Sequence, residues 1–226
     1  FLSSRFYSFG EKAREKAAKQ SDYDRENVHL LNARQKSEEF IRRIRPYPAG
    51  RYSGRGIVLC SGGVKYFTNA WVCIQLLRQH GCRLPIEVWH LGRHEIDRRM
   101  EDLLKPLGVR CVNAREVMNR HPLRNPLGWE LKSYAILHSS FREILFLDSD
   151  NVPTRNPEFL FETAPYRALG AIFWPDYLRL PRRHPIWKIT GISWQDEPEF
   201  ETGQMVINKE VCWRAVNLAF WYNDHS

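Results

Sequence analysis

Two aspartates one residue apart, Asp148 and Asp150, directly follow the run Glu-Ile-Leu-Phe-Leu at 143–147. Two carboxylates this close repel each other unless a cation lies between them or one of them is protonated. Carboxylate oxygens are hard ligands that suit Mg²⁺ or Mn²⁺, ions that commonly bridge protein carboxylates and nucleotide phosphates. The spacing therefore predicts a metal site, the alternative being a surface turn, for which Asp-Ser-Asp-Asn is also suited.

Other polar residues fall beside further apolar or helical segments. Gly62 and Gly63 follow a short apolar run, where glycines either let backbone N–H groups approach a phosphate or base, or simply form a tight turn. Lys132 precedes the aspartates on a helical segment and could contact a phosphate or a sugar hydroxyl, or be an ordinary exposed lysine. Glu201 and Gln204 flank a glycine before another apolar run. Such groups bind sugar hydroxyls or stabilise developing positive charge, or form an acidic loop.

A segment rich in tryptophan and basic residues lies between these groups. Trp174 is followed by Pro175 and Asp176, and Trp187 and Trp194 come later. Aromatic rings stack on the C–H faces of sugars or fill a core. Together with the nearby arginines they also resemble a surface that binds nucleic acid, but no recognised nucleic-acid motif accompanies them. We predict a surface loop here.

The elements that would position these residues alternate between short apolar runs and amphipathic helices. Strands are predicted at 57–59, 86–91, 109–112, 143–148, 168–173 and 204–208. Helical periodicity is present at 67–77, 100–107 and 134–141, and a last helix is predicted from residue 210. Such alternation predicts an α/β fold with a largely parallel sheet. The ligand crevice of such a sheet lies beyond the carboxyl ends of its strands, where Asp148 would stand.

The composition fits a folded protein with an anionic partner. The chain has 226 residues, of which 43% are hydrophobic, and a formal net charge of +8, although a solvated basic face explains that charge as well. It lacks an apolar run of about 18 residues, so no membrane span is predicted. None of the five cysteines forms a Cys-x-x-Cys pair, which argues against a zinc knuckle; a disulfide between Cys82 and Cys111 stays open.

The N-terminal part differs in character from the rest. Residues 11–45 are rich in Lys, Glu, Arg and Ala with few apolar positions, which predicts one or two charged helices. Prolines and glycines follow at 46–56 and mark a boundary. We therefore predict a charged helical stem at 1–53 and an α/β domain at 54–226.

Six segments between Gly54 and Lys209 resemble the fungal α-mannosyltransferases that build mannan branches in the Golgi. Their shared order and spacing are more specific than any single segment. They are Gly-Arg-Gly-Ile-Val-Leu-Cys-Ser-Gly-Gly (54–63), Leu-Arg-Gln-His-Gly-Cys-Arg-Leu-Pro-Ile-Glu-Val-Trp (77–89), Leu-Lys-Ser-Tyr-Ala-Ile-Leu (131–137), Leu-Asp-Ser-Asp-Asn (147–151), Phe-Trp-Pro-Asp (173–176) and Glu-Thr-Gly-Gln (201–204).

The resemblance implies a GT-A fold for 54–226 and a transferase of protein glycosylation. The implied enzyme moves mannose from GDP-mannose to a mannose-containing glycan with retention of configuration, and uses Mn²⁺ or Mg²⁺. Carried over residue by residue, it assigns catalytic roles to Asp148, Asp150, Glu201 and Gln204, with Asp148 and Asp150 holding the metal. It assigns donor binding to Ser61, Gly62, Gly63, Lys132, Asp148, Ser149 and Asp176.

The chain departs from that family in two respects. Relatives continue beyond a helix like the one from Glu210 with a further acidic segment, so the catalytic domain is expected to be incomplete at its C-terminus. The usual type II membrane anchor is also missing, so it is expected outside this chain. Residence on the lumenal side of the Golgi membrane is implied by the resemblance alone.

Two other functions fit parts of the sequence. Phosphotransferases of the haloacid dehalogenase type have an apolar strand followed by Asp-x-Asp-x-Thr/Val, which 148–152 satisfies. Their motif normally lies on an early strand, whereas three predicted strands precede Asp148. A non-catalytic subunit that binds a sugar or nucleotide is the other alternative. Nucleic acid is not an expected partner.

Overall fold

The structure is a computed structural model that describes residues 27–124, 128 and 130–225. The chain forms two compact units. The smaller unit includes the helical residues 27–43 and the segment Arg179–Glu197, which contains helix α7 (Ile186–Thr190). The charged helix predicted over 11–45 is thus present at 27–43, and its residues 11–26 lie outside the described residues. The boundary predicted after residue 53 stays a prediction.

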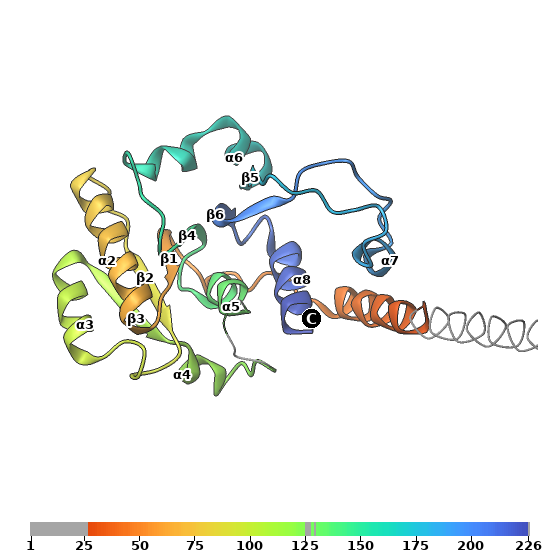
Figure 1. Cartoon of the computed structure of the whole chain (residues 1–226), viewed down its shortest axis with the longest axis horizontal. Helices are drawn as coiled ribbons and strands as arrows, with labels where there is room; N and C mark the ends of the chain where they lie inside the picture. The colour runs from red at the N-terminus through yellow and green to blue at the C-terminus, as the bar shows by residue number, and fades with distance from the viewer. Residues whose placement is uncertain (1–26, 125–127, 129, 226) are drawn as a thin grey trace, which may run out of the picture. The chain divides into compact units, whose positions relative to one another are not determined.

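A six-stranded sheet forms the centre of the larger unit, which comprises Ile44–Leu178 and the chain from Pro198 onward (Figure 1). The strand order is β3-β2-β1-β4-β6-β5. Strands β1 to β4 are parallel, and β6 runs antiparallel to both β4 and β5. The strands are β1 (Arg55–Cys60), β2 (Ile86–His90), β3 (Val109–Asn113), β4 (Glu143–Asp148), β5 (Ala171–Pro175) and β6 (Phe200–Asn208). The predicted α/β class with a mostly parallel sheet is confirmed.

Helices cover both faces of this sheet, and each face has its own hydrophobic cluster. Helices α2 (Gly63–Gln79) and α3 (Arg98–Leu104) cover one face, and α5 (Glu130–His138) and α8 (Trp213–Asp224) cover the other (Figure 1). Because both faces are covered, β4 reads as an apolar run rather than as an alternating pattern. The shorter helices are η1 (Lys105–Leu107), α4 (Ala114–Met118), η2 (Pro157–Glu162) and α6 (Ala164–Leu169).

Three predicted boundaries differ from the structure. The strand expected at 168–173 begins only at Ala171, because α6 runs to Leu169 and ends at Gly170, whose φ of 72° suits a glycine helix cap. The helix expected to reach residue 141 ends at His138, and Phe141 packs against Gly56. The last helix begins at Trp213. All five cysteines are free, so the disulfide left open between Cys82 and Cys111 is not formed. None of the helices in the described residues has the length and apolar character needed to cross a membrane.

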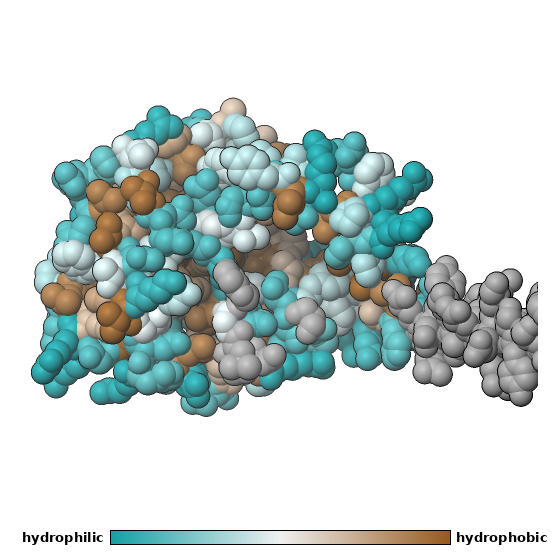
Figure 2. Space-filling view, in the orientation of Figure 1, coloured by the Kyte–Doolittle hydropathy of each residue, from teal (hydrophilic) through white to brown (hydrophobic). Residues whose placement is uncertain are grey.

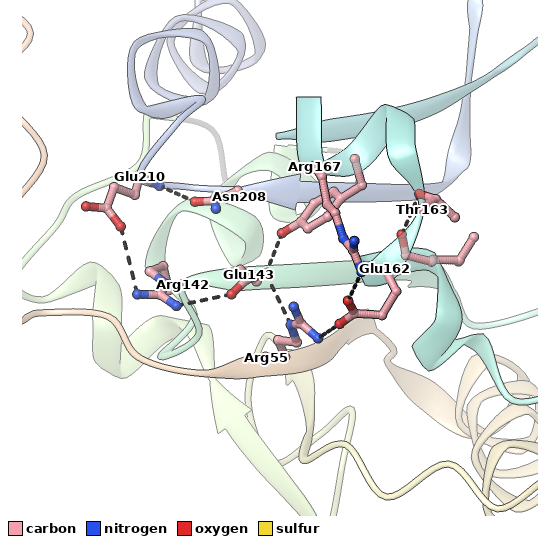
Figure 3. A network of polar contacts seen from close by, with 10 residues as sticks. Arg55, Arg142, Glu143, Glu162, Thr163, Arg167, Asn208 and Glu210 are labelled. Carbon is pink, nitrogen blue, oxygen red and sulfur yellow. Dashed lines mark hydrogen bonds and ion pairs between the residues drawn. The ribbon is translucent and has the colours of Figure 1, made fainter. Parts of the chain in front are cut away.

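A network of ion pairs fixes the amino end of β4 (Figure 3). Glu143 accepts hydrogen bonds from Arg55, Arg142 and the Tyr166 hydroxyl, at 3.2, 3.2 and 2.8 Å. These partners come from β1, the loop before β4, and α6, so several elements are tied to one carboxylate. The pKa of Glu143 lies below its usual value, because these bonds outweigh the effect of burial. The strand that ends at Asp148 is therefore held firmly at its other end.

Lys209 is a buried lysine next to the C-terminus of α5. Its side chain is fully buried, its Nζ donates to the Ser139 carbonyl at 2.7 Å, and it lies 3.6 Å from the centre of the Tyr52 ring. Burial lowers the pKa of Lys209 to about 6, whereas an unfolded chain keeps lysine near about 10.4. Between these values the unfolded chain binds more protons than the folded one, so the free energy of unfolding rises with pH.

We expect replacing Lys209 by methionine to remove most of this pH dependence. Between pH 7 and 8, where histidine and cysteine of the unfolded chain contribute least, the wild type should gain about 1 kcal/mol of unfolding free energy. Urea unfolding at several pH values measures this slope, with exposed Lys65→Met as the matched control. A slope that K209M leaves intact would contradict the assignment.

Candidate active site

The carboxyl ends of β2, β1 and β4 lie side by side at one edge of the sheet. Cys60, the last residue of β1, is in register with Trp89 of β2 and with Asp148 of β4. Because these strands are parallel, the residues that follow them meet at this edge. They are Ser61 to Gly63 after β1, Leu91 to Glu95 after β2, and Ser149 to Asn151 after β4.

Asp148 and Lys132 form an ion pair at this edge. Lys132 Nζ, from the first turn of α5, lies 2.7 Å from Asp148 Oδ2, and both side chains are largely buried. Burial raises the pKa of the Asp148 carboxyl above its usual value; Lys132 opposes this shift, and the negative charges of Asp150 and Glu201 add to it. The two predicted residues are thus brought together, with two further carboxylates near them.

Glu201 approaches Asp148 because a glycine lies between them. Gly203 N donates to Glu201 Oε1 at 2.6 Å. A Cβ on Gly203 would lie 3.0 Å from Glu201 Oε1 and 3.4 Å from Asp148 Oδ2, so the absence of a side chain there makes room for both carboxylates. The side chain of Asn151 connects the two strands at this point. Its Nδ2 donates to the Gly203 carbonyl at 2.7 Å and to the Asp148 carbonyl at 3.2 Å.

A carboxylate that the sequence analysis did not single out also lies at this edge. A Cβ on Gly62 would lie 2.5 Å from the carboxyl carbon of Glu95. The space left by the missing side chain of Gly62 is therefore filled by Glu95. Gly63, with a φ of 68°, begins α2 and donates its N–H to the Glu95 carbonyl at 3.0 Å.

The structure does not gather every predicted residue. Gln204 is in register with Leu147, whose side chain packs on the α2 face, whereas Asp148 meets α5 on the opposite face. Asp176 follows β5, two strands away from β4, and its Oδ1 accepts from its neighbour Tyr177. Ser149 is buried, and Asp150 is exposed. Their predicted roles stay predictions.

The carboxylates fit a divalent cation only with additional ligands. Among the residues that the structure describes, no three His, Cys, Asp or Glu side chains are grouped so that they could hold a metal ion. The negative charges of Asp150 and Glu201 nevertheless act on the Asp148 carboxyl. Their oxygens suit Mn²⁺ or Mg²⁺, which usually complete their coordination with waters and phosphate oxygens. The donor set thus fits an ion shared with a phosphate ligand.

A largely apolar pocket adjoins these carboxylates. It has a volume of about 410 Å³ and lies between α5, α8, β5 and β6, with Lys132 and Glu201 in its lining. Two stacked and partly exposed rings, Phe173 and Phe200, line it as well, with ring centres 5.0 Å apart. Figure 2 shows a hollow with apolar side chains over this part of the molecule. Trp174, which could have stacked on a sugar, instead packs against the core.

This arrangement can bind a ligand that carries both phosphate and sugar. Lys132 supplies a positive charge, Asp148 and Asp150 supply oxygen ligands, and Glu201 places a negative charge near them. Negative charge of this kind stabilises the positive charge that develops on a sugar carbon as its bond to a leaving group breaks. Sequence analysis missed Glu95 and Asn151, because their contacts involve residues distant along the chain.

Comparison with known proteins relates the chain to mannosyltransferases. The chain is 32% identical over 204 residues to alpha-1,2-mannosyltransferase MNN24 of Candida albicans, an alignment of 75% of this chain and 29% of that protein. It is 31% identical over 149 residues to alpha-1,2-mannosyltransferase MNN2 of Saccharomyces cerevisiae, covering 65% of this chain and 25% of that protein. The chain thus spans less than a third of these relatives' length.

A solved structure supports the fold assignment. The bifunctional glycosyltransferase WbbM in its apo form superposes with a TM-score of 0.52 and 13% identity, over 78% of this chain and 35% of that one. This likeness concerns the fold alone and agrees with the predicted GT-A architecture. The model of the Mannosyl_trans3 family matches residues 54–197, well over half of the chain and most of the sheet. The chain therefore belongs to the Mannosyl_trans3 family of mannosyltransferases.

Proposed function

We propose that this chain carries the donor site of an α-1,2-mannosyltransferase. The enzyme transfers mannose from GDP-mannose to a mannose-containing glycan, retains the configuration of the sugar, and requires Mn²⁺ or Mg²⁺. The linkage follows from the two relatives, which are alpha-1,2-mannosyltransferases, and the donor, the retention of configuration and the metal follow from the family resemblance. The observation that carries the proposal is the Lys132–Asp148 ion pair with Glu201 beside it, at the carboxyl edge of the sheet.

Each residue at this edge of the sheet has its own role in the proposed reaction. Asp148 and Asp150 hold the cation, which when bound neutralises negative charge on the departing diphosphate. Lys132 is within reach of the same charge and orients the phosphates. Glu201, held by the N–H of Gly203, faces the sugar and stabilises positive charge at its reacting carbon.

The other predicted residues keep the roles that the family resemblance gives them. Ser61, Gly62 and Gly63 lie along the nucleotide. Ser149 and Asp176 contact the donor, and Gln204 faces the sugar.

The setting of the enzyme is part of the proposal. A mannosyltransferase of this family would act in protein glycosylation on the lumenal side of the Golgi membrane, with a type II anchor outside this chain. The family match decides against the haloacid dehalogenase alternative. A non-catalytic subunit that binds donor without turnover remains the second candidate, because this chain spans only a part of its relatives.

Calorimetry with nucleotides tests the donor site directly. GDP, UDP and their mannose and glucose conjugates are titrated into the protein with and without Mn²⁺. We expect GDP-mannose to bind selectively and only with the cation. Preference for a uridine conjugate would overturn the mannosyl assignment, and absence of any binding would overturn the donor site. Transfer to an α-mannoside then separates the enzyme from a non-catalytic subunit.

Substituting Gly203 by alanine should impair transfer more than binding. The added methyl group would press on Glu201 Oε1 from 3.0 Å and displace that carboxylate. A misplacement of this order costs about tenfold to a hundredfold in turnover. The measurement is kcat for transfer beside GDP affinity, with exposed neighbour Thr202→Ala as control. Unchanged kcat in G203A would contradict the role given to Glu201.

A further inference from the structure

Glu95 occupies a position that its structural contacts alone do not explain. Its carboxylate lies flat against Gly62, at the point where β1 passes into α2. One oxygen, Oε2, accepts the N–H of Leu91 at 2.5 Å. The other, Oε1, accepts no hydrogen bond from the described residues, and the side chain is partly exposed. A carboxylate is thus held in a fixed orientation with an oxygen left for a ligand.

The backbone around Glu95 fixes that orientation. The Gly63 N–H donates to the Glu95 carbonyl at 3.0 Å, and the Glu95 N–H donates to Gly92 at 3.0 Å. The next residue, Ile96, is fully buried in the core. Because the residue is anchored on both sides, its side chain is pre-organised for binding.

The position of Glu95 along the sheet edge indicates which part of a ligand it meets. Glu95 follows β2, Ser61 follows β1 and Asp148 ends β4, and these strands are neighbours in that order. The Glu95 carboxylate accepts from Leu91, which follows β2, and fills the space beside Gly62, which follows β1. It therefore lies between the ends of these two strands, on the side of β1 away from Asp148. Ser61, the residue after β1, is 5% exposed, and its Oγ has no partner among the described residues.

We propose that Glu95 recognises the base of the nucleotide donor and selects guanine over uracil. The inference rests on the proposed function, in which the diphosphate lies at Asp148. The end of the donor farthest from the diphosphate is its base, and that end falls at Glu95. Guanine presents two adjacent donors, N1–H and the exocyclic amino group, which Oε1 and the second lone pair of Oε2 can accept. Uracil presents one N–H between two carbonyl oxygens, which a carboxylate repels.

Replacing Glu95 by glutamine tests the inference with little structural change. The amide oxygen can still accept the Leu91 N–H, but the amide group cannot accept from both guanine donors. Affinities are measured for GDP, inosine diphosphate, 2′-deoxy-GDP and UDP, with Mn²⁺ present. Inosine lacks the exocyclic amino group, so the wild type should bind its diphosphate about tenfold more weakly than GDP. In E95Q that difference should close, GDP should bind about tenfold more weakly, and UDP should change by less than about threefold.

The matched control is Glu101→Gln, an equal change of charge at an exposed position of α3. It should leave all four affinities unaltered. An E95Q protein that keeps the wild-type ratio of GDP to UDP affinity overturns the inference and leaves the proposed function standing. An equal loss for all four nucleotides, or a loss of only the 2′-deoxy difference, also overturns it, because Glu95 would then act elsewhere than on the base. If the wild type binds none of them, the proposed function itself fails.

Discussion

Replacing Asp148 by asparagine should reduce mannosyl transfer by on the order of 10³-fold. Asparagine keeps the size of the side chain but removes the charge that pairs with Lys132 at 2.7 Å. In the proposed function the variant loses a cation ligand, and Lys132 loses its ion pair with Asp148. Both effects fall on the departing diphosphate. The measurement is kcat for transfer from GDP-mannose at saturating cation, and nucleotide binding by calorimetry should also become independent of Mn²⁺.

The control for this variant is Asp102→Asn, the same change at an exposed position of α3. It should transfer mannose at the wild-type rate. Asp150→Asn, which removes the exposed partner carboxylate, should resemble D148N if both hold the cation. A D148N protein that keeps more than a tenth of the wild-type turnover, with a native circular dichroism spectrum, would refute the role of Asp148.

Truncating Phe146 to alanine should lower the free energy of unfolding by about 3–5 kcal/mol. Phe146 is fully buried in the middle of β4 and packs in the cluster under α5. Its ring also lies 6.0 Å from Lys132 Nζ. The substitution would leave a cavity between β4 and α5, the two elements that position the ion pair, so transfer should weaken together with stability. Urea unfolding followed by circular dichroism measures the loss.

Phe159→Ala provides the comparison, because this phenylalanine is 40% exposed and packs against the Arg155 guanidinium. We expect it to cost less than about 1 kcal/mol. If F146A and F159A lower the free energy of unfolding equally, the packing of β4 against α5 contributes less to stability than the burial of Phe146 indicates.

Local patterns predicted much of the fold and of the site. The apolar run before Asp148 is buried because helices cover both faces of the sheet. A continuous apolar run is typical of such a strand, so the sequence alone predicts this burial. Lys132 was predicted to be a candidate site residue because it lies on the helix that precedes the aspartates. In the structure its side chain extends from the first turn of α5 to Asp148. The sequence analysis noted the glycine between Glu201 and Gln204; that it makes room for the Glu201 and Asp148 carboxylates was not predicted and is seen only in the structure.

The remainder depends on information that a local pattern does not contain. An apolar run does not reveal its direction, so the antiparallel course of β6 was not predicted, although it brings Glu201 beside Asp148. The direction of β6 also determines which side of the sheet Gln204 faces, because it places Gln204 in register with Leu147. Glu95 and Asn151 act through glycines and carbonyls distant in sequence, and only the folded chain brings them together.

Backbone hydrogen bonds join the chain that leaves β5 to the chain that enters β6, just beyond the ends of these two strands. Asp176 N donates to the Glu199 carbonyl at 2.6 Å, and Glu199 N donates to the Leu178 carbonyl at 2.8 Å. The intervening segment, Arg179–Glu197, belongs to the other unit. Insertions are tolerated where the flanking backbone is already fixed. During evolution, this segment can therefore lengthen, shorten or be exchanged while Glu201 stays in place, and related enzymes should diverge in length here before they diverge at the carboxylates.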